Sequence, residues 1–241
     1  MRILIIRHGD PDYENDCLTE RGKKEAESLS KYLEGQKIDY FYMSPLGRAM
    51  ETASYTLKRF GKQAEILPWA REFHAPITIG GESPHIPWDW LPEQWTAEKR
   101  YFDRDSWFLT DVMQNGNVIS EARRVWDGLD ELLKKHGYER IDDHYKVNAP
   151  NSDTIALFCH FGVECVMLAH LLGVSPMTLW HGCCALTTSV TELYTEERRK
   201  GKAYFRMIRF GNTEHLTIDG IKPSFSGRFC EMYDNTDERH D

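Results

Sequence analysis

The sequence has no hydrophobic run long enough to cross a membrane and no excess of basic residues. A membrane-spanning helix needs roughly 20 apolar residues, and the N-terminus also lacks the basic, apolar and small-residue regions of a signal peptide. The 241 residues carry a formal net charge of -8, which disfavours the broad basic surface that nucleic acid or anionic lipid requires. We therefore expect a cytoplasmic protein that binds neither nucleic acid nor membrane, and whose anionic ligands need a local positive pocket.

Cysteine pairs with the spacing of a zinc site are also missing. None of the six cysteines forms a C-x-x-C pair. Apolar neighbours surround four of them, and in such surroundings a free thiol packs as a small hydrophobe. These four are Cys159, Cys165, Cys183 and Cys184. The sequence therefore predicts reduced thiols rather than a metal or disulfide framework.

Strand patterns alternate with helical patterns along the first part of the chain. Ile3 to Ile6 is a continuous, mostly β-branched run, which is typical of a strand buried on both faces of a parallel sheet. A helix with Thr19 as its N-cap follows, then a strand over Ile38 to Met43. A second helix is predicted to begin with Ser44 as its N-cap and to end at Gly61.

The alternation continues in the C-terminal half. Strands are predicted at Ala64 to Leu67, Thr154 to Cys159 and Thr187 to Tyr194, with the helical stretch "FGVECVMLAHLLG" between the last two. Ala203 to Phe210 is predicted to be a hairpin partner at the edge of the sheet, and Asp142 to Asp153 an exposed connector. The whole pattern predicts one domain over residues 1–241, a three-layer α/β/α sandwich around a mostly parallel central sheet.

Residues 73–153 interrupt this alternation with an aromatic-rich insertion. It holds four of the seven tryptophans, Trp88, Trp90, Trp95 and Trp107, followed by a predicted helix from about residue 119 to residue 135. A long insertion in a compact domain is typical of a lid or binding lobe. The aromatic side chains could equally form a small core of the insert's own, because aromatic residues dominate core burial.

Polar side chains follow four of the predicted strands at the point where each strand ends. They are Arg7 and His8 after the first strand, Arg48 in the opening turn of the helix after the second, Glu72 after the third, and His160 after "TIALFC". In an open parallel sheet the ligand site lies beyond the carboxyl ends of the strands. We therefore expect these side chains to meet at one edge of the sheet.

Such a cluster suits phosphoryl transfer. Arg7 and Arg48 are predicted to hold phosphate oxygens, since a planar guanidinium can bind two oxygens at once. A neutral imidazole can attack phosphorus through one nitrogen while the other donates to a backbone carbonyl, which makes His8 the predicted nucleophile. His160, beside a helix N-terminus, is predicted to donate to the phosphate and to stabilise charge in the transition state.

Glu72 is the predicted proton donor to the leaving alkoxide. A carboxyl group held next to phosphate has its pKa raised by the like charge, so it can carry a proton near neutral pH. Three other acidic residues are alternatives for this role: Asp10, Glu82 and Glu93.

The basic residues also have structural interpretations. Arg48 could form an ordinary ion pair with Glu51 or Glu72, which contributes little when it is exposed. His8 and His160 could be buried histidines whose ring nitrogens are satisfied by the backbone.

Four motifs in this order, "RHG", "SPLGRAMETA", "REF" and "CHFG", resemble those of the histidine phosphatase superfamily, also called phosphoglycerate mutase-like. The stretches "TTSVTEL" and "RFGNTEHL" resemble its closing strands, and only the insertion is unlike it. The resemblance implies a phosphoglycerate mutase-like fold, no metal and no other cofactor. The site residues that it implies are a phosphohistidine at His8, a phosphate pocket of Arg7, Arg48 and His160, and an acid at Glu72.

Departures from the mutase pattern favour the phosphatase branch. Mutases usually carry Ser or Thr after an acidic residue and Asn six places beyond the nucleophile, whereas this chain has Pro11 after Asp10, and Glu14 at the Asn position. The Trp-containing mutase signature is missing as well. We expect a phosphatase acting on a small-molecule phosphate ester, as a monomer or homodimer. A phosphoglycerate-type mutase and a non-catalytic phosphoester-binding protein on the same fold are the alternatives.

Overall fold

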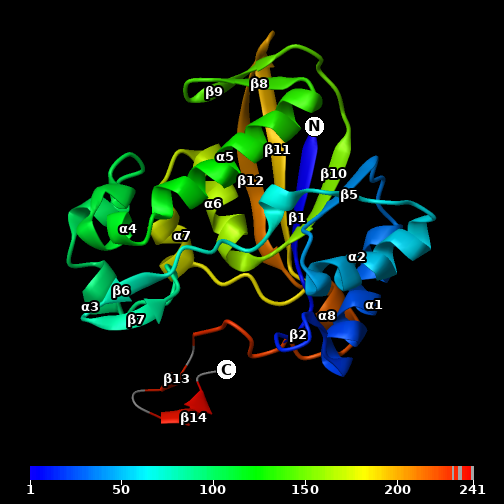
Figure 1. Ribbon diagram of the computed structural model, residues 1–241. Helices are drawn as coiled ribbons and strands as arrows, with labels where there is room; N and C mark the ends of the chain where they lie inside the picture. The colour runs from blue at the N-terminus through cyan, green and yellow to red at the C-terminus, as the bar shows by residue number, and fades with distance from the viewer. Residues whose placement is uncertain (230, 233–234, 240–241) are drawn as a thin grey trace.

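The computed structural model describes residues 1–229, 231–232 and 235–239, with the side chains of 82–84 and 231–239 left out of the description. A mixed eight-stranded sheet forms its centre (Figure 1). Its parallel half contains β5 (Glu65–Ile66), β4 (Tyr40–Met43), β10 (Thr154–Cys159) and β1 (Arg2–Arg7). Its antiparallel half contains β11 (Val190–Arg199), β12 (Lys202–Asn212), β9 (His144–Val147) and β8 (Tyr138–Ile141). The strands lie in the order β5-β4-β10-β1-β11-β12-β9-β8.

Helices cover both faces of this sheet (Figure 1). One face carries α1 (Glu20–Glu34) and α2 (Gly47–Phe60), with α8 (Glu214–Ile218) against α1. The other carries α5 (Val118–Lys135), α6 (Phe161–Leu172) and α7 (Pro176–Gly182). Three small hairpins lie outside the central sheet: β2 (Pro11–Asp12) with β3 (Cys17–Leu18), β6 (Ile77–Ile79) with β7 (Glu82–His85), and β13 (Glu231–Met232) with β14 (Asn235–Arg239). Two further helices are short, α3 (Pro92–Trp95) and α4 (Asp111–Asn115). Turns of 3₁₀ helix occur at Pro68–Ala70, Lys99–Phe102 and Trp107–Leu109.

The apolar run of β1 divides between two hydrophobic cores. Side chains alternate across a strand, so Ile3 and Ile5 pack under α5 and α6 while Leu4 and Ile6 pack under α1 and α2. Because both faces are covered, every residue of the run has to be apolar. The predicted three-layer α/β/α fold is therefore confirmed. The sheet is mixed rather than mostly parallel as predicted: it is parallel only from β5 to β1, and β11, β12, β9 and β8 pair in the antiparallel direction.

Two predictions about the far edge of the sheet are wrong. The segment Asp142 to Asp153, predicted to be a connector, contains β9 and pairs with β8 in a hairpin. The strand predicted at Ala203 to Phe210 is not at the edge, because Lys202 and Ala203 pair with β9. Both errors have one cause: the strand pattern of β8 and β9 is too short to be recognised locally.

The helix caps are partly as expected. Thr19 caps α1 by accepting a hydrogen bond from the backbone N–H of Gly22 at 3.1 Å, and Gly61 ends α2 in the left-handed conformation. Ser44 does not cap α2, because the helix begins only at Gly47 with Leu46 as its N-cap. The hydroxyl of Ser44 has another partner, described below.

The aromatic side chains of the insertion belong to the main core. Trp107 is completely buried, and its ring lies 5.7 Å from that of Trp180 on α7, centroid to centroid. Trp90 and Tyr101 join the same continuous cluster as β1 and α6. The insertion therefore has no separate core, and α5 lies close to the bounds expected for its helix. In the described part of the chain, no helix is long and apolar enough to cross a membrane.

A substitution at Gly128, in the middle of α5, tests how closely this helix packs against the ring of Trp69. A Cβ atom there would lie 2.2 Å from Cγ of Trp69. Replacing a helical glycine with alanine normally stabilises a protein by up to about 1 kcal/mol. Here we expect Gly128→Ala to destabilise the fold by about 1–2 kcal/mol in urea denaturation, because the ring has to shift. Gly182→Ala, where nothing lies within 4 Å, is the matched control and should be neutral or stabilising. A Gly128→Ala protein as stable as wild type would contradict the packing.

Candidate active site

Three neighbouring parallel strands bring the predicted residues to one edge of the sheet. The backbone N–H of His8, just after β1, donates to the carbonyl of Cys159 at 3.0 Å, and that of Ser44, just after β4, donates to Phe158 at 2.8 Å. His160 follows β10 as the N-cap of α6. Since 10 of the 12 residues of α6 are buried, this helix holds its N-terminus firmly at the sheet edge.

The two histidines lie side by side. Their ring centroids are 5.1 Å apart, and both rings are buried, with exposed fractions of 2% for His8 and 0% for His160. Nδ1 of His8 lies 2.7 Å from the carbonyl oxygen of Gly9. Because a carbonyl can only accept, Nδ1 carries the proton, and Nε2 keeps its lone pair. This is the arrangement that the sequence argument required of a nucleophile.

Burial and positive neighbours hold both imidazoles neutral. Desolvation, then the charges of Arg7 and Arg48, place the pKa of His8 well below its usual value. The pKa of His160 is likewise well below its usual value, because of burial and its neighbours His8, Arg48 and Arg7. Near neutral pH each ring therefore carries a single N–H.

Both arginines lie beside the histidines. Nη1 of Arg7 donates to the carbonyl of Ala185 at 2.5 Å. Nη1 of Arg48 donates to Oδ1 of Asp16 at 2.6 Å, and the ring of Tyr13 lies 5.4 Å from the guanidinium carbon. The carboxylate partner of Arg48 among the described residues is thus Asp16, rather than the Glu51 or Glu72 that the sequence suggested.

Three buried side-chain nitrogen atoms in this cluster have no hydrogen-bond partner among the described residues. They are Nε of Arg7, Nε of Arg48 and Nδ1 of His160. Leaving one buried donor unpaired costs about 1–3 kcal/mol. An arrangement that leaves three of them together is suited to an anion with several acceptor oxygens.

Glu72 lies half-buried against the start of α6. Its Oε1 accepts from the backbone N–H groups of Phe73 at 2.8 Å and Val163 at 2.9 Å, and its Oε2 accepts from Gly162 at 3.3 Å. Burial raises its pKa, while these N–H groups and Arg48 act in the opposite direction. Glu72 is therefore a carboxyl group fixed against Gly162 and Val163, two and three residues beyond His160, with an increased tendency to hold a proton.

The insertion reaches the site through Trp88. A Cβ atom on Gly162 would lie 2.6 Å from the Trp88 ring and 2.9 Å from Oε1 of Glu72. Only glycine at position 162 lets the ring and the carboxyl approach the helix start so closely. Trp88 thus borders the candidate proton donor.

The alternative proton donors are less well placed. Asp10 accepts hydrogen bonds from Oγ1 of Thr19 at 2.6 Å and from the hydroxyl of Ser224, so both its oxygens are occupied. Glu93 is exposed on α3. The side chain of Glu82 lies outside the described residues.

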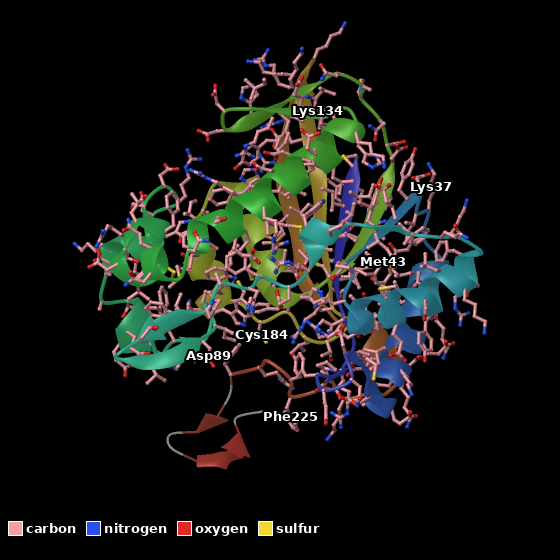
Figure 2. The ribbon with its side chains drawn as sticks, viewed as in Figure 1. Lys37, Met43, Asp89, Lys134, Cys184 and Phe225 are labelled. Atoms are coloured by element: carbon pink, nitrogen blue, oxygen red, sulfur yellow. The ribbon has the colours of Figure 1, made fainter. Side chains whose placement is uncertain are left out.

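The segment after α8 passes over Arg7. The Ser224 hydroxyl donates to Asp10, Sγ of Cys184 donates to the carbonyl of Gly227 at 3.3 Å, and a Cβ on Gly227 would lie 3.0 Å from Nη2 of Arg7. Figure 2 shows Asp89, Cys184 and Phe225 lying toward this edge from three different segments. The described residues contain no group of three or more His, Cys, Asp or Glu that could hold a metal ion, and metal independence stays a prediction.

Three residues of this region were not foreseen as parts of the site. Ser44 follows β4 directly, so the rule that singled out His8 and His160 could have found it. Asp16 lies in an irregular loop with no local signal. Glu164 stands out as the one acid inside an apolar helix. It is fully buried, and burial raises its pKa to about 8, so it is largely neutral near pH 7.

The chain is similar in sequence to known phosphatases and to a phosphoglycerate mutase. The sequence profile described as histidine phosphatase superfamily (branch 1) matches residues 3–207. Phosphoserine phosphatase 1 of Hydrogenobacter thermophilus is 24% identical over 213 residues, covering 83% of this chain and 89% of that protein. A 2,3-bisphosphoglycerate-dependent phosphoglycerate mutase of Thermoplasma acidophilum is 36% identical over 69 residues, covering 24% of this chain and 34% of that protein.

A solved structure has the same fold. The phosphoserine phosphatase of Entamoeba histolytica, crystallised as a mutant with phosphoserine, aligns with a TM-score of 0.60 at 17% identity, covering 89% of this chain and 98% of that chain.

Proposed function

The chain belongs to branch 1 of the histidine phosphatase superfamily and is an enzyme of that type, and from this premise we propose that it hydrolyses small-molecule phosphate monoesters through a phosphohistidine on His8. The observation that carries the proposal is a set of three buried nitrogen atoms, on Arg7, Arg48 and His160, that have no partner among the described residues and belong to the close neighbours of His8. A tetrahedral phosphate offers an acceptor to each of these atoms and its phosphorus to the lone pair on Nε2 of His8.

In the first step, Nε2 of His8 attacks phosphorus and the bond from phosphorus to the ester oxygen breaks. The leaving oxygen takes the bond's electron pair and a proton from Glu72. Arg7, Arg48 and His160 stabilise the negative charge on the three equatorial oxygens, and because they are already fixed by the fold, no reorganisation is needed at that moment. The products of this step are the free alcohol and phosphohistidine.

In the second step, water attacks the phosphohistidine from the side that the alcohol has left. Glu72, now a carboxylate, accepts a proton from that water, and Nε2 of His8 leaves with its electron pair. Inorganic phosphate forms and the site returns to its starting state. One carboxyl group can serve as acid and then as base because its raised pKa brings it closer to neutral pH.

The leaving group is proposed to lie against Trp88. That ring borders Glu72 at the start of α6, where the departing oxygen has to be protonated. This location supports the interpretation of residues 73–153 as the part of the chain that selects the substrate.

Removing the nucleophile is the direct test. We expect His8→Ala to lower turnover of p-nitrophenyl phosphate by at least about 1000-fold, because the variant lacks the proposed nucleophile. The variant should also fail to acquire acid-labile phosphate after a rapid quench with labelled substrate. His144→Ala, on β9 away from the site, is the control and should keep both properties. Substantial turnover by His8→Ala would assign the nucleophile elsewhere.

The role of Glu72 is tested by the leaving group. We expect Glu72→Gln to slow alkyl phosphates about 100-fold but aryl phosphates less than about 10-fold, because an aryl oxide hardly needs a proton.

The pH profile provides a second readout of the same variant. Since the protonated acid is needed, wild-type turnover of an alkyl ester should fall as pH rises through the pKa of Glu72, which burial raises. That decline should vanish in Glu72→Gln, while Glu93→Gln should behave as wild type. An equal loss on alkyl and aryl esters would remove Glu72 from the role.

A further inference from the structure

We infer that Ser44 is a positioning residue, whose hydroxyl donates to Nε2 of His160 and so keeps the imidazole proton on Nδ1, facing the phosphate. The identity of the anion rests on the proposed function. The hydrogen bond and the tautomer do not, because they belong to the free protein.

The geometry around Ser44 is closely defined. Its side chain is completely buried, as is that of His160, and its Oγ lies 2.7 Å from Nε2 of His160. The backbone of Ser44 is held by the hydrogen bond to Phe158 on β10, the strand that leads directly into His160. Adjacent parallel strands therefore set the two side chains against each other.

The direction of this hydrogen bond follows from what else Ser44 contacts. The backbone N–H of Leu46 donates to Oγ of Ser44 at 3.2 Å. For the Ser44 O–H itself, the ring nitrogen of His160 is the acceptor among the described residues. If Nε2 carried the proton, the hydroxyl would accept twice and its own hydrogen would have no acceptor in this buried place, which costs free energy.

The tautomer with a bare Nε2 also suits the surroundings of Nδ1, the other ring nitrogen of His160. Nδ1 of His160 is buried and has no partner among the described residues. Burial and the neighbouring positive charges keep the ring neutral, so it has one N–H to place. With Nε2 accepting from Ser44, that N–H is on Nδ1 and can donate to an anion. With the opposite tautomer, a lone pair would face the anion and repel it.

The two histidines thus offer different groups to the proposed phosphate, a lone pair from His8 and an N–H from His160. His8 donates its Nδ1–H to Gly9 and presents the lone pair of Nε2. His160 accepts at Nε2 from Ser44 and presents the N–H of Nδ1. The first arrangement produces a nucleophile and the second a hydrogen-bond donor, although both rings are neutral. The difference comes from their partners, a carbonyl for one and a hydroxyl for the other.

The hydrogen bond from Ser44 to His160 explains why Ser44 is not the N-cap of α2. A serine three residues before the start of α2 could cap that helix only if its side chain turned toward the helix N–H groups. Ser44 instead turns to His160, and α2 begins with the apolar N-cap Leu46, which has no side-chain cap hydrogen bond.

The tautomer can be observed directly by nitrogen NMR on the ¹⁵N-histidine-labelled protein without substrate, where protonated and bare ring nitrogens have distinct chemical shifts. The His160 signals are those lost in His160→Asn. In wild type we expect a bare Nε2 and a protonated Nδ1, and in Ser44→Ala a protonated Nε2 or a mixture. A protonated Nε2 in wild type, or an unchanged tautomer in Ser44→Ala, would overturn the inference.

Binding of vanadate provides a second readout. Ser44→Ala should weaken it roughly 10-fold or more, since one hydrogen bond to a charged group is lost or inverted. Ser30→Ala is the matched control, because Ser30 is equally buried, accepts from Arg59 at 3.0 Å and donates to Glu27 at 2.7 Å on α1. It should bind vanadate as wild type does. Unchanged vanadate affinity in Ser44→Ala would contradict the role.

The two hypotheses fail separately. A wild-type protein with the expected tautomer that neither binds vanadate nor hydrolyses an aryl phosphate overturns the proposed function and supports the assignment of the Ser44 hydrogen bond. A wild-type protein that turns over substrate with Nε2 of His160 protonated overturns the inference about Ser44 and leaves the phosphatase proposal intact.

Discussion

The site depends on one constraint, the packing of three buried basic side chains, Arg7, His8 and His160, with the partly buried Arg48 at one edge of the sheet. Burial, and after it the positive charges of Arg7 and Arg48, lowers the pKa of both His8 and His160 and keeps both imidazoles neutral. Three buried nitrogen atoms of this cluster have no partner within the described part of the chain. The unsatisfied donors and the two fixed positive charges favour a polyanion of phosphate size over any neutral ligand.

The fold supplies the rigidity that such a cluster needs. Parallel strands β1, β10 and β4 end together, and the apolar helix α6 fixes the start of the segment that carries His160. Backbone groups then assign the roles: a carbonyl orients His8, and three N–H groups hold the carboxylate of Glu72. His8 and Glu72 are therefore held in place by main-chain hydrogen bonds, which is the form of preorganisation that the proposed mechanism requires.

Local sequence pattern was enough to predict the parallel half of the fold and the candidate site. A continuous apolar run, buried on both faces, identifies a central strand, and the residues after such strands have to meet at one edge. The β8–β9 hairpin was missed because its two four-residue strands are too short to show a recognisable local pattern. The partner of Arg48 was missed for a different reason, since Asp16 lies 32 residues away along the chain, in an irregular loop. Ser44 was assigned to a helix cap because its competing partner, His160, is far along the chain.

A crystal structure with orthovanadate tests the central claim most directly. The account predicts one bound vanadate with its metal atom in line with Nε2 of His8 and its oxygens within hydrogen-bond distance of Arg7, Arg48 and Nδ1 of His160. A vanadate bound elsewhere, or one that contacts the arginines while the two imidazoles point away from it, would contradict the account.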